Sequence, residues 1–145
     1  IARASGSLPY LSPIVHIDNI PMLDGGLSDS IPVERAMSQG CEKCIVVLTR
    51  NKGYRKKKSY FPMPNFMYRK YPQLQETLRN RHDLYNQQLD LVEQLEADGK
   101  ILVIRPILPI EVDRIEKDAV KLDKLYNEGY ECAQKANIAE FIKAT

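Results

Sequence analysis

The triplet Asp24-Gly25-Gly26 holds the side chain of this 145-residue chain that is best placed to do chemistry. It follows an apolar stretch, Ile14 to Leu23, whose composition is typical of β-strands. An acid at the carboxyl end of a strand lies where α/β sheets place their ligands. Two glycines after it let the backbone turn with positive φ and let another segment approach the carboxylate. Asp-Gly is also a common turn dipeptide, so the triplet alone leaves a purely structural role open.

Other side chains suited to catalysis or metal binding are few. His16 falls within the apolar stretch and His82 on the apolar face of a predicted helix, and we expect neither to act as a base. Cys41 and Cys44 have Cys-x-x-Cys spacing, but they run into a predicted strand, whereas a redox pair sits at a helix N-terminus. A structural zinc would need a second ligand pair. We therefore expect neither a redox pair nor a metal site at these cysteines.

The apolar pattern of the first 50 residues predicts an α/β fold. Ile14 to Leu23, with Asp18-Asn19 as a turn, predicts two short strands in a hairpin. A short helix opens at Pro32 and stops at Gly40. Cys44 to Thr49 is a continuous apolar run, typical of a strand buried on both faces of a parallel sheet.

The later residues are predicted to be mainly helical. A long helix runs from Pro72 to about Ala97, and Ile101 to Ile104 forms a second buried strand. A further helix is interrupted at Gly129, and a last one covers Tyr130 to Ile142. The apolar residues that mark the interrupted helix are Ile115, Leu122, Leu125 and Tyr126. The aromatic and Met-rich segment from Tyr60 to Tyr71 is predicted to be irregular or a short helix.

Residues 1–50 resemble the C-terminal part of the catalytic domain of patatin-like phospholipases. The features that carry this resemblance, in the family's order and spacing, are Ala4-Ser5, Pro9, Asp24-Gly25-Gly26-Leu27, Ile31-Pro32-Val33, Ala36, Gly40 and Ile45-Val46-Val47. Ser30 stands where many members carry Asn, and we expect it to shape the loop. The later helices look like the tail of a bacterial patatin-like subgroup.

The resemblance implies a partial three-layer patatin-like fold, with a mostly parallel sheet flanked by helices and a helical C-terminal region. Residues 1–58 would be the C-terminal part of the catalytic domain. Residues 59–145 would be a helix-rich extension with one further strand at about 101–105.

In that family the Asp of the Asp-Gly-Gly motif is half of a Ser-Asp dyad. The resemblance therefore implies that Asp24 takes the proton of a nucleophilic serine during hydrolysis of a lipid or other acyl ester, without a cofactor. The expected Gly-x-Ser-x-Gly elbow and glycine-rich oxyanion loop do not occur in these residues, and family order places both upstream of Ile1. We thus expect this chain alone to be inactive, and to self-associate if the absent part covers an apolar face.

Charge and composition bear on partners and location. The net charge is +2, with a basic cluster from Arg50 to Lys58 ahead of the aromatic segment. This cluster is a solvated loop or a contact for an anionic membrane surface. A non-catalytic lipid- or protein-binding module is the alternative function. Nucleic acid is a weaker candidate, because no recognition motif accompanies the cluster. Without a secretory signal or a long apolar run, and with an odd number of cysteines, three, we expect a cytoplasmic protein.

Overall fold

The computed structural model describes residues 1–58, 66–112 and 116–144 of a mixed α/β protein. Tyr60, Phe61 and Met63 of the aromatic segment lie outside these residues, as does Ile115. The chain forms two compact units that are interleaved along the sequence. The first unit comprises residues 1–32 and the described part of 56–90, and the second comprises 33–55 and the described residues from 91 onward. Each unit therefore draws on both sides of the predicted boundary at residues 58 and 59.

The first unit contains a hairpin and most of the long helix. Its elements are α1 (Ala2–Ser5), β1 (Val15–Ile17), β2 (Ile20–Met22), the 3₁₀ turn η1 (Gly25–Leu27) and the part of α3 (Pro72–Ala97) up to residue 90. The strands pair antiparallel, with Val15 opposite Met22. Asp18 and Asn19 have φ values of 51° and 63°, as both central residues of a type I′ turn require. The predicted hairpin is confirmed.

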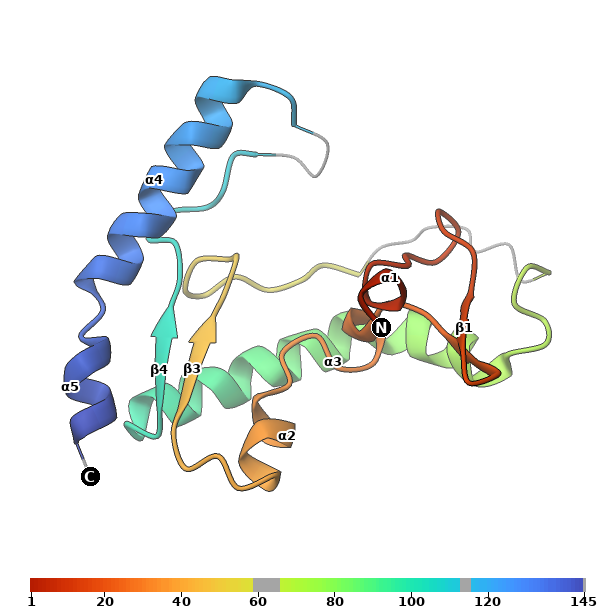
Figure 1. The fold of residues 1–145 in the computed structure, drawn as a ribbon, viewed down its shortest axis with the longest axis horizontal. Coiled ribbons are helices and arrows are strands. Elements are labelled where there is room, and N and C mark those ends of the chain that lie inside the picture. Colours follow the sequence, from red (N-terminus) through yellow and green to blue (C-terminus); the bar gives the residue numbers. More distant parts are fainter. Residues whose placement is uncertain (59–65, 113–115, 145) are drawn as a thin grey trace. The chain divides into compact units, whose positions relative to one another are not determined.

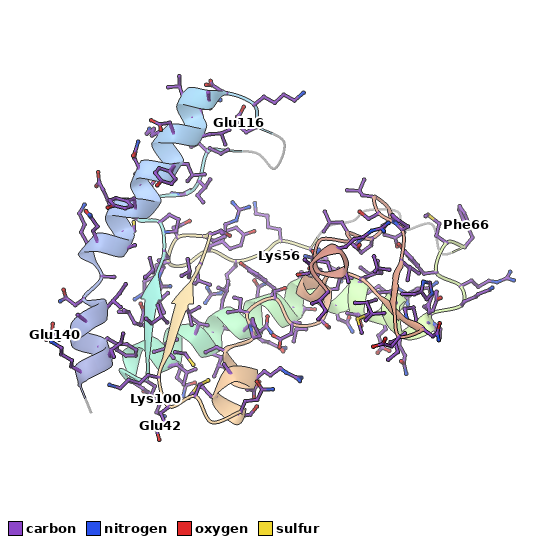
Figure 2. The ribbon with its side chains drawn as sticks, viewed as in Figure 1. Glu42, Lys56, Phe66, Lys100, Glu116 and Glu140 are labelled. Atoms are coloured by element: carbon purple, nitrogen blue, oxygen red, sulfur yellow. The ribbon has the colours of Figure 1, made fainter. Side chains whose placement is uncertain are left out.

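The second unit contains a parallel strand pair and the C-terminal helices. Its elements are α2 (Val33–Ser38), β3 (Cys44–Val47), the end of α3, β4 (Ile101–Ile104), α4 (Ala119–Lys135) and α5 (Ile138–Lys143). β3 and β4 lie side by side and run parallel, with Cys44 beside Ile101 (Figure 1). Glu42 and Lys100, which precede the two strands, lie at the same end of the pair (Figure 2). The predicted strands, their parallel direction and the short α2 are confirmed.

The prediction that β3 is buried on both faces is wrong. Ile45 and Val47 are 40% and 70% exposed, whereas Cys44 and Val46, on the opposite face, are half-buried. A strand with alternating exposure has one covered face. A run of apolar β-branched residues reports strand propensity, and the same run fits a strand with one face covered or with two.

The long helix α3 begins and ends as predicted. Its apolar stripe buries Leu89 in the first unit, and Val92 and Leu95 in the second. Gly99 follows the helix with a φ of 69°, and the Lys100 N–H donates to the Leu95 carbonyl at 3.0 Å. This is the left-handed glycine that commonly ends helices. No helix among the described residues is long and apolar enough to cross a bilayer.

The C-terminal helices break at a different place from the one predicted. Asp118 caps the start of α4 by accepting a hydrogen bond from the Val120 N–H at 2.9 Å. The helix then continues through Gly129, because one glycine inside a helix costs only about 1 kcal/mol. It ends where Ala136 becomes extended, with a ψ of 122°, and Asn137 precedes α5.

Lys43 ties the end of α5 to the segment just before β3. Its Nζ donates to the carbonyls of Phe141 at 2.8 Å and Ile142 at 3.1 Å, and also to that of Ala144. The same ammonium lies 5.5 Å from the centroid of the Phe141 ring. The last carbonyls of a helix lack partners within the helix and carry negative partial charge, so a lysine is a favourable cap for them.

Candidate active site

Asp24 lies at the start of the turn η1, and its carboxylate is held by the backbone. Its Oδ1 accepts a hydrogen bond from the Gly26 N–H at 2.8 Å. The Asp24 N–H donates to the carbonyl of Ser7, a buried residue, at 2.9 Å. The Asp24 residue is half-buried. Its other carboxylate oxygen, Oδ2, accepts no hydrogen bond from the residues that the structure describes, so one face of the carboxylate is open to a further donor.

The strand that precedes Asp24 is not part of a parallel sheet. Within the described residues β2 pairs with β1 alone, in the antiparallel hairpin. The sequence predicts Asp24 at the carboxyl end of a strand in an α/β sheet, where ligands bind, and the antiparallel hairpin does not provide that position. Its orientation comes from the turn η1 instead.

Gly26 is needed for close approach, whereas neither glycine of the triplet has a positive φ. A Cβ atom added at Gly26 would lie 3.2 Å from Asp24 Oδ1 and 3.9 Å from Arg81 Nη2. A Cβ atom at Gly25 would meet nothing within 4 Å. The predicted left-handed turn at these glycines is wrong, and the tight contact at Gly26 is with the Asp24 carboxylate and not with another segment, since Arg81 lies at an ordinary contact distance.

Two side chains form hydrogen bonds with the carbonyl of Gly26. It accepts hydrogen bonds from Ser30 Oγ at 2.7 Å and from Arg81 Nε at 3.0 Å. Ser30 thus shapes the loop, as its position in the sequence predicts. Arg81 belongs to α3, so a residue 55 positions away in the sequence holds the turn that carries Asp24.

Gln88 holds the other end of the same loop. Its Oε1 accepts from the N–H groups of Ser30 at 3.2 Å and Ile31 at 3.1 Å. Its Nε2 donates to Asp29 Oδ1 at 2.6 Å. Gln88 lies seven residues after Arg81 in α3, close to two helical turns, so the two side chains share one face of the helix.

Sequence reasoning missed Arg81 and Gln88. The prediction of α3 rested on its apolar stripe alone. Their seven-residue spacing places them on one face of the helix and is the sequence signal that could have identified them. Because such spacing is common on the polar faces of helices, it has little specificity.

Neither histidine is hydrogen-bonded to Asp24 in the part of the chain that the structure covers. His16 is exposed on β1, opposite Pro21. The His82 side chain is 14% exposed, and its Nε2 lies 3.0 Å from Oδ1 of the adjacent Asp83.

The cysteine pair has the environment predicted for a turn entering a strand. Cys44 is the first residue of β3 and Cys41 is exposed ahead of it. Burial, and then the proximity of Cys41, raise the pKa of the Cys44 thiol. A reactive thiol needs its pKa lowered, so this environment does not favour redox chemistry. Within residues 1–58, 66–112 and 116–144, no cluster of three or more His, Cys, Asp or Glu is arranged to hold a metal ion.

Several charged side chains of the basic cluster at 50–58 interact with other residues of the protein. In the second unit, Arg55 donates from Nη1 and Nη2 to both carboxylate oxygens of Glu93, each at 3.1 Å. The hydrogen bond from Arg55 is the main reason why the pKa of Glu93 is lowered. Also in that unit, the Arg50 guanidinium lies 5.1 Å from the centroid of the Tyr54 ring.

The part of the cluster in the first unit packs on α3. The Lys56 N–H donates to Asn86 Oδ1 at 2.7 Å, and Asn86 Nδ2 donates back to the Lys56 carbonyl at 3.0 Å. The Lys56 ammonium lies 4.9 Å from the centroid of the Tyr85 ring. Lys57 and Lys58 are exposed, as is Lys52 in the second unit.

Comparison with known proteins places the second half of the chain in a family. Residues 71–143, just over half of the chain, match the family described as "Domain of unknown function (DUF6363)". The chain belongs to this family. The matched region begins one residue before α3 and ends with α5, so it contains both Arg81 and Gln88.

A curated relative shares a shorter stretch. Fifty residues are 40% identical to "Uncharacterized protein YjjU" of Escherichia coli (strain K12). The match covers 34% of this chain and 14% of that protein, so the chain spans about a seventh of the relative's length.

The close approach at Gly26 predicts different effects for the same substitution at the two glycines. We expect Gly26→Ala to lower the free energy of unfolding by about 1 kcal/mol, because the new Cβ displaces the Asp24 carboxylate. Gly25→Ala, the matched control, has open space and should leave this free energy unchanged or raise it by up to about 1 kcal/mol. Urea unfolding of the two variants measures the difference. Equal values would contradict the crowding at Gly26.

The lowered pKa of Glu93 predicts a pH-dependent contribution to stability. The pair with Arg55 stabilises the fold above the ordinary pKa of 4.5, and this stabilisation is lost as the pH falls through the lower, folded-state value. Because the Arg55 side chain is 39% exposed, we expect Glu93→Gln to cost only about 0.5–1 kcal/mol at neutral pH. Urea unfolding over a pH series tests this, with the exposed Glu34→Gln as control. A cost that persists at acidic pH would contradict the assignment.

Proposed function

We propose that this chain is the C-terminal part of a patatin-like serine acyl hydrolase and supplies Asp24 as the base of its Ser-Asp dyad. The observation that carries the proposal is the state of the Asp24 carboxylate. One of its oxygens is held by the Gly26 N–H, and the other accepts no hydrogen bond from the described residues. A carboxylate fixed on one side and open on the other is suited to receive the hydroxyl proton of a serine.

The proposed fold is the three-layer arrangement with a mostly parallel sheet. The parallel pair of β3 and β4 supports it, as does the exposure of Ile45 and Val47 on β3. An exposed apolar strand face is what a strand shows when further parts of a layered fold cover it in the complete protein. The same exposure supports the expectation that the isolated chain self-associates.

In the proposed reaction the serine and the oxyanion loop come from the part of the complete polypeptide upstream of Ile1. The serine oxygen forms a bond to the acyl carbon of an ester while its proton passes to Asp24. The ester C–O bond then breaks, and the leaving alcohol takes that proton. Water attacks the resulting acyl-serine, gives a proton to Asp24, and the proton returns to the serine oxygen as the carboxylic acid leaves. Atoms and charges balance with water as co-reactant, without a metal or organic cofactor.

The proposed substrate is a lipid or related acyl ester, reached at a membrane surface. In the first unit Phe66 and Met67, from the aromatic segment, are 79% and 50% exposed, while Tyr68 is buried. Lys57 and Lys58 in the same unit are exposed. Apolar side chains together with lysines suit peripheral contact with anionic lipid. A lipid-binding module without catalysis would use the same residues and is the alternative function.

The dyad predicts the effect of removing the negative charge of Asp24. In the complete polypeptide we expect Asp24→Asn to reduce ester hydrolysis by at least about 100-fold, because an amide cannot accept the serine proton. Hydrolysis of a p-nitrophenyl acyl ester measures this. Asp18→Asn in the hairpin turn is the matched control, since Asn adopts the left-handed conformation found there. Undiminished turnover by Asp24→Asn would remove Asp24 from the mechanism.

The membrane contact makes a prediction that does not require catalysis. We expect the chain to bind vesicles that contain phosphatidylserine and to lose this binding steeply as salt is raised. Replacing Lys57 and Lys58 together by Gln should weaken it about tenfold. The matched control replaces the exposed Lys117 and Lys124 by Gln. Cosedimentation with the vesicles measures the binding. Binding that does not change with salt concentration, or that is equal in the two double variants, would rule out this contact.

A further inference from the structure

We propose that α3, the first helix of the DUF6363 region, acts as a clamp that positions Asp24, with Arg81 and Gln88 as its positioning residues. The inference rests on the proposed function of Asp24. It gives the helical region a part in the active site of the complete protein, although neither side chain touches the reacting atoms.

The contact through Arg81 leads directly to the carboxylate. Arg81 Nε donates to the Gly26 carbonyl at 3.0 Å. The N–H of Gly26 in turn donates to Asp24 Oδ1 at 2.8 Å. The two groups belong to neighbouring peptide planes that meet at the Gly26 Cα atom. The guanidinium therefore anchors the residue whose N–H orients Asp24 and restricts the positions open to that N–H.

The contact through Gln88 fixes the far end of the loop. The side chain makes three hydrogen bonds, because Oε1 accepts from two backbone N–H groups and Nε2 donates to a carboxylate. The loop between Asp24 and Ile31 is thus bound at two points to one rigid helix, about 10 Å apart along its axis. A loop held at both points cannot re-aim its carboxylate without breaking one of these contacts.

The clamp explains why polar side chains occupy this face of α3. A hydrogen bond to a half-exposed carbonyl adds little to stability, because water would replace it. Misplacement of a catalytic group by about 1 Å, in contrast, can cost a factor of about 100 in rate. We therefore expect the loss of Arg81 or Gln88 to affect orientation and rate more than folding.

The first arm of the test uses this chain without any substrate. In Arg81→Met we expect hydrogen exchange of the Gly26 amide to rise about tenfold, and in Gln88→Met that of the Ser30 and Ile31 amides. Arg79→Met is the matched control, since Arg79 is exposed on the same helix. Exchange at these amides that equals the control would overturn the clamp. Circular dichroism verifies that the variants retain their helices.

The second arm measures catalysis in the complete polypeptide. Arg81→Met should lower kcat by between about 10-fold and about 100-fold with little change in KM, and Arg81→Lys, which keeps a donor, should recover part of the loss. If Asp24→Asn is inactive while Arg81→Met keeps the wild-type kcat, the clamp is overturned and the dyad stands. If Asp24→Asn is fully active, both proposals fail.

Discussion

The hydrogen bond from the Gly26 N–H to Asp24 Oδ1 is the contact on which the candidate site depends. A carboxylate has two oxygens and rotates easily, so one short bond to the backbone decides which oxygen remains open. A Cβ atom added at Gly26 would lie 3.2 Å from the same oxygen, a tight contact that would require a small shift of the carboxylate. The absence of a side chain at Gly26 thus leaves the carboxylate undisturbed in the orientation set by this hydrogen bond.

This bond has support on both sides of the turn. On one side the Asp24 N–H is held by the carbonyl of the buried Ser7. On the other side α3 holds the Gly26 carbonyl and the following loop through Arg81 and Gln88. These helix residues lie in the DUF6363 match, whereas the turn lies before it. The first unit therefore combines the segment that carries Asp24 with a helix of the DUF6363 match, and hydrogen bonds join the two segments.

Local features of the chain were predictable from sequence, and contacts between distant segments were not. Asp18-Asn19 specified a hairpin because both residue types tolerate the left-handed conformation, and Gly99 ended α3 for the same reason. The exposure of Val47 depends on what covers the strand, which its own residues do not encode. Gly129 was given too much weight, because one glycine weakens a helix without stopping it. Arg81 and Gln88 have partners more than 50 residues away, so no local pattern could identify them.

The firm support around Asp24 is consistent with the chemical weakness of the acid as a base. A free aspartate has a pKa of about 3.9, far below that of a serine hydroxyl, so it accepts that proton poorly in water. A triad meets this difficulty with a histidine, but the described hydrogen bonds connect neither His16 nor His82 to Asp24. What remains available to a dyad is geometry: an acid already aimed at the hydroxyl, and an oxyanion site that stabilises the charge as it forms. A turn fixed by its own backbone and by a helix on one side would supply the first of these, which is why the proposed catalytic role falls on this turn.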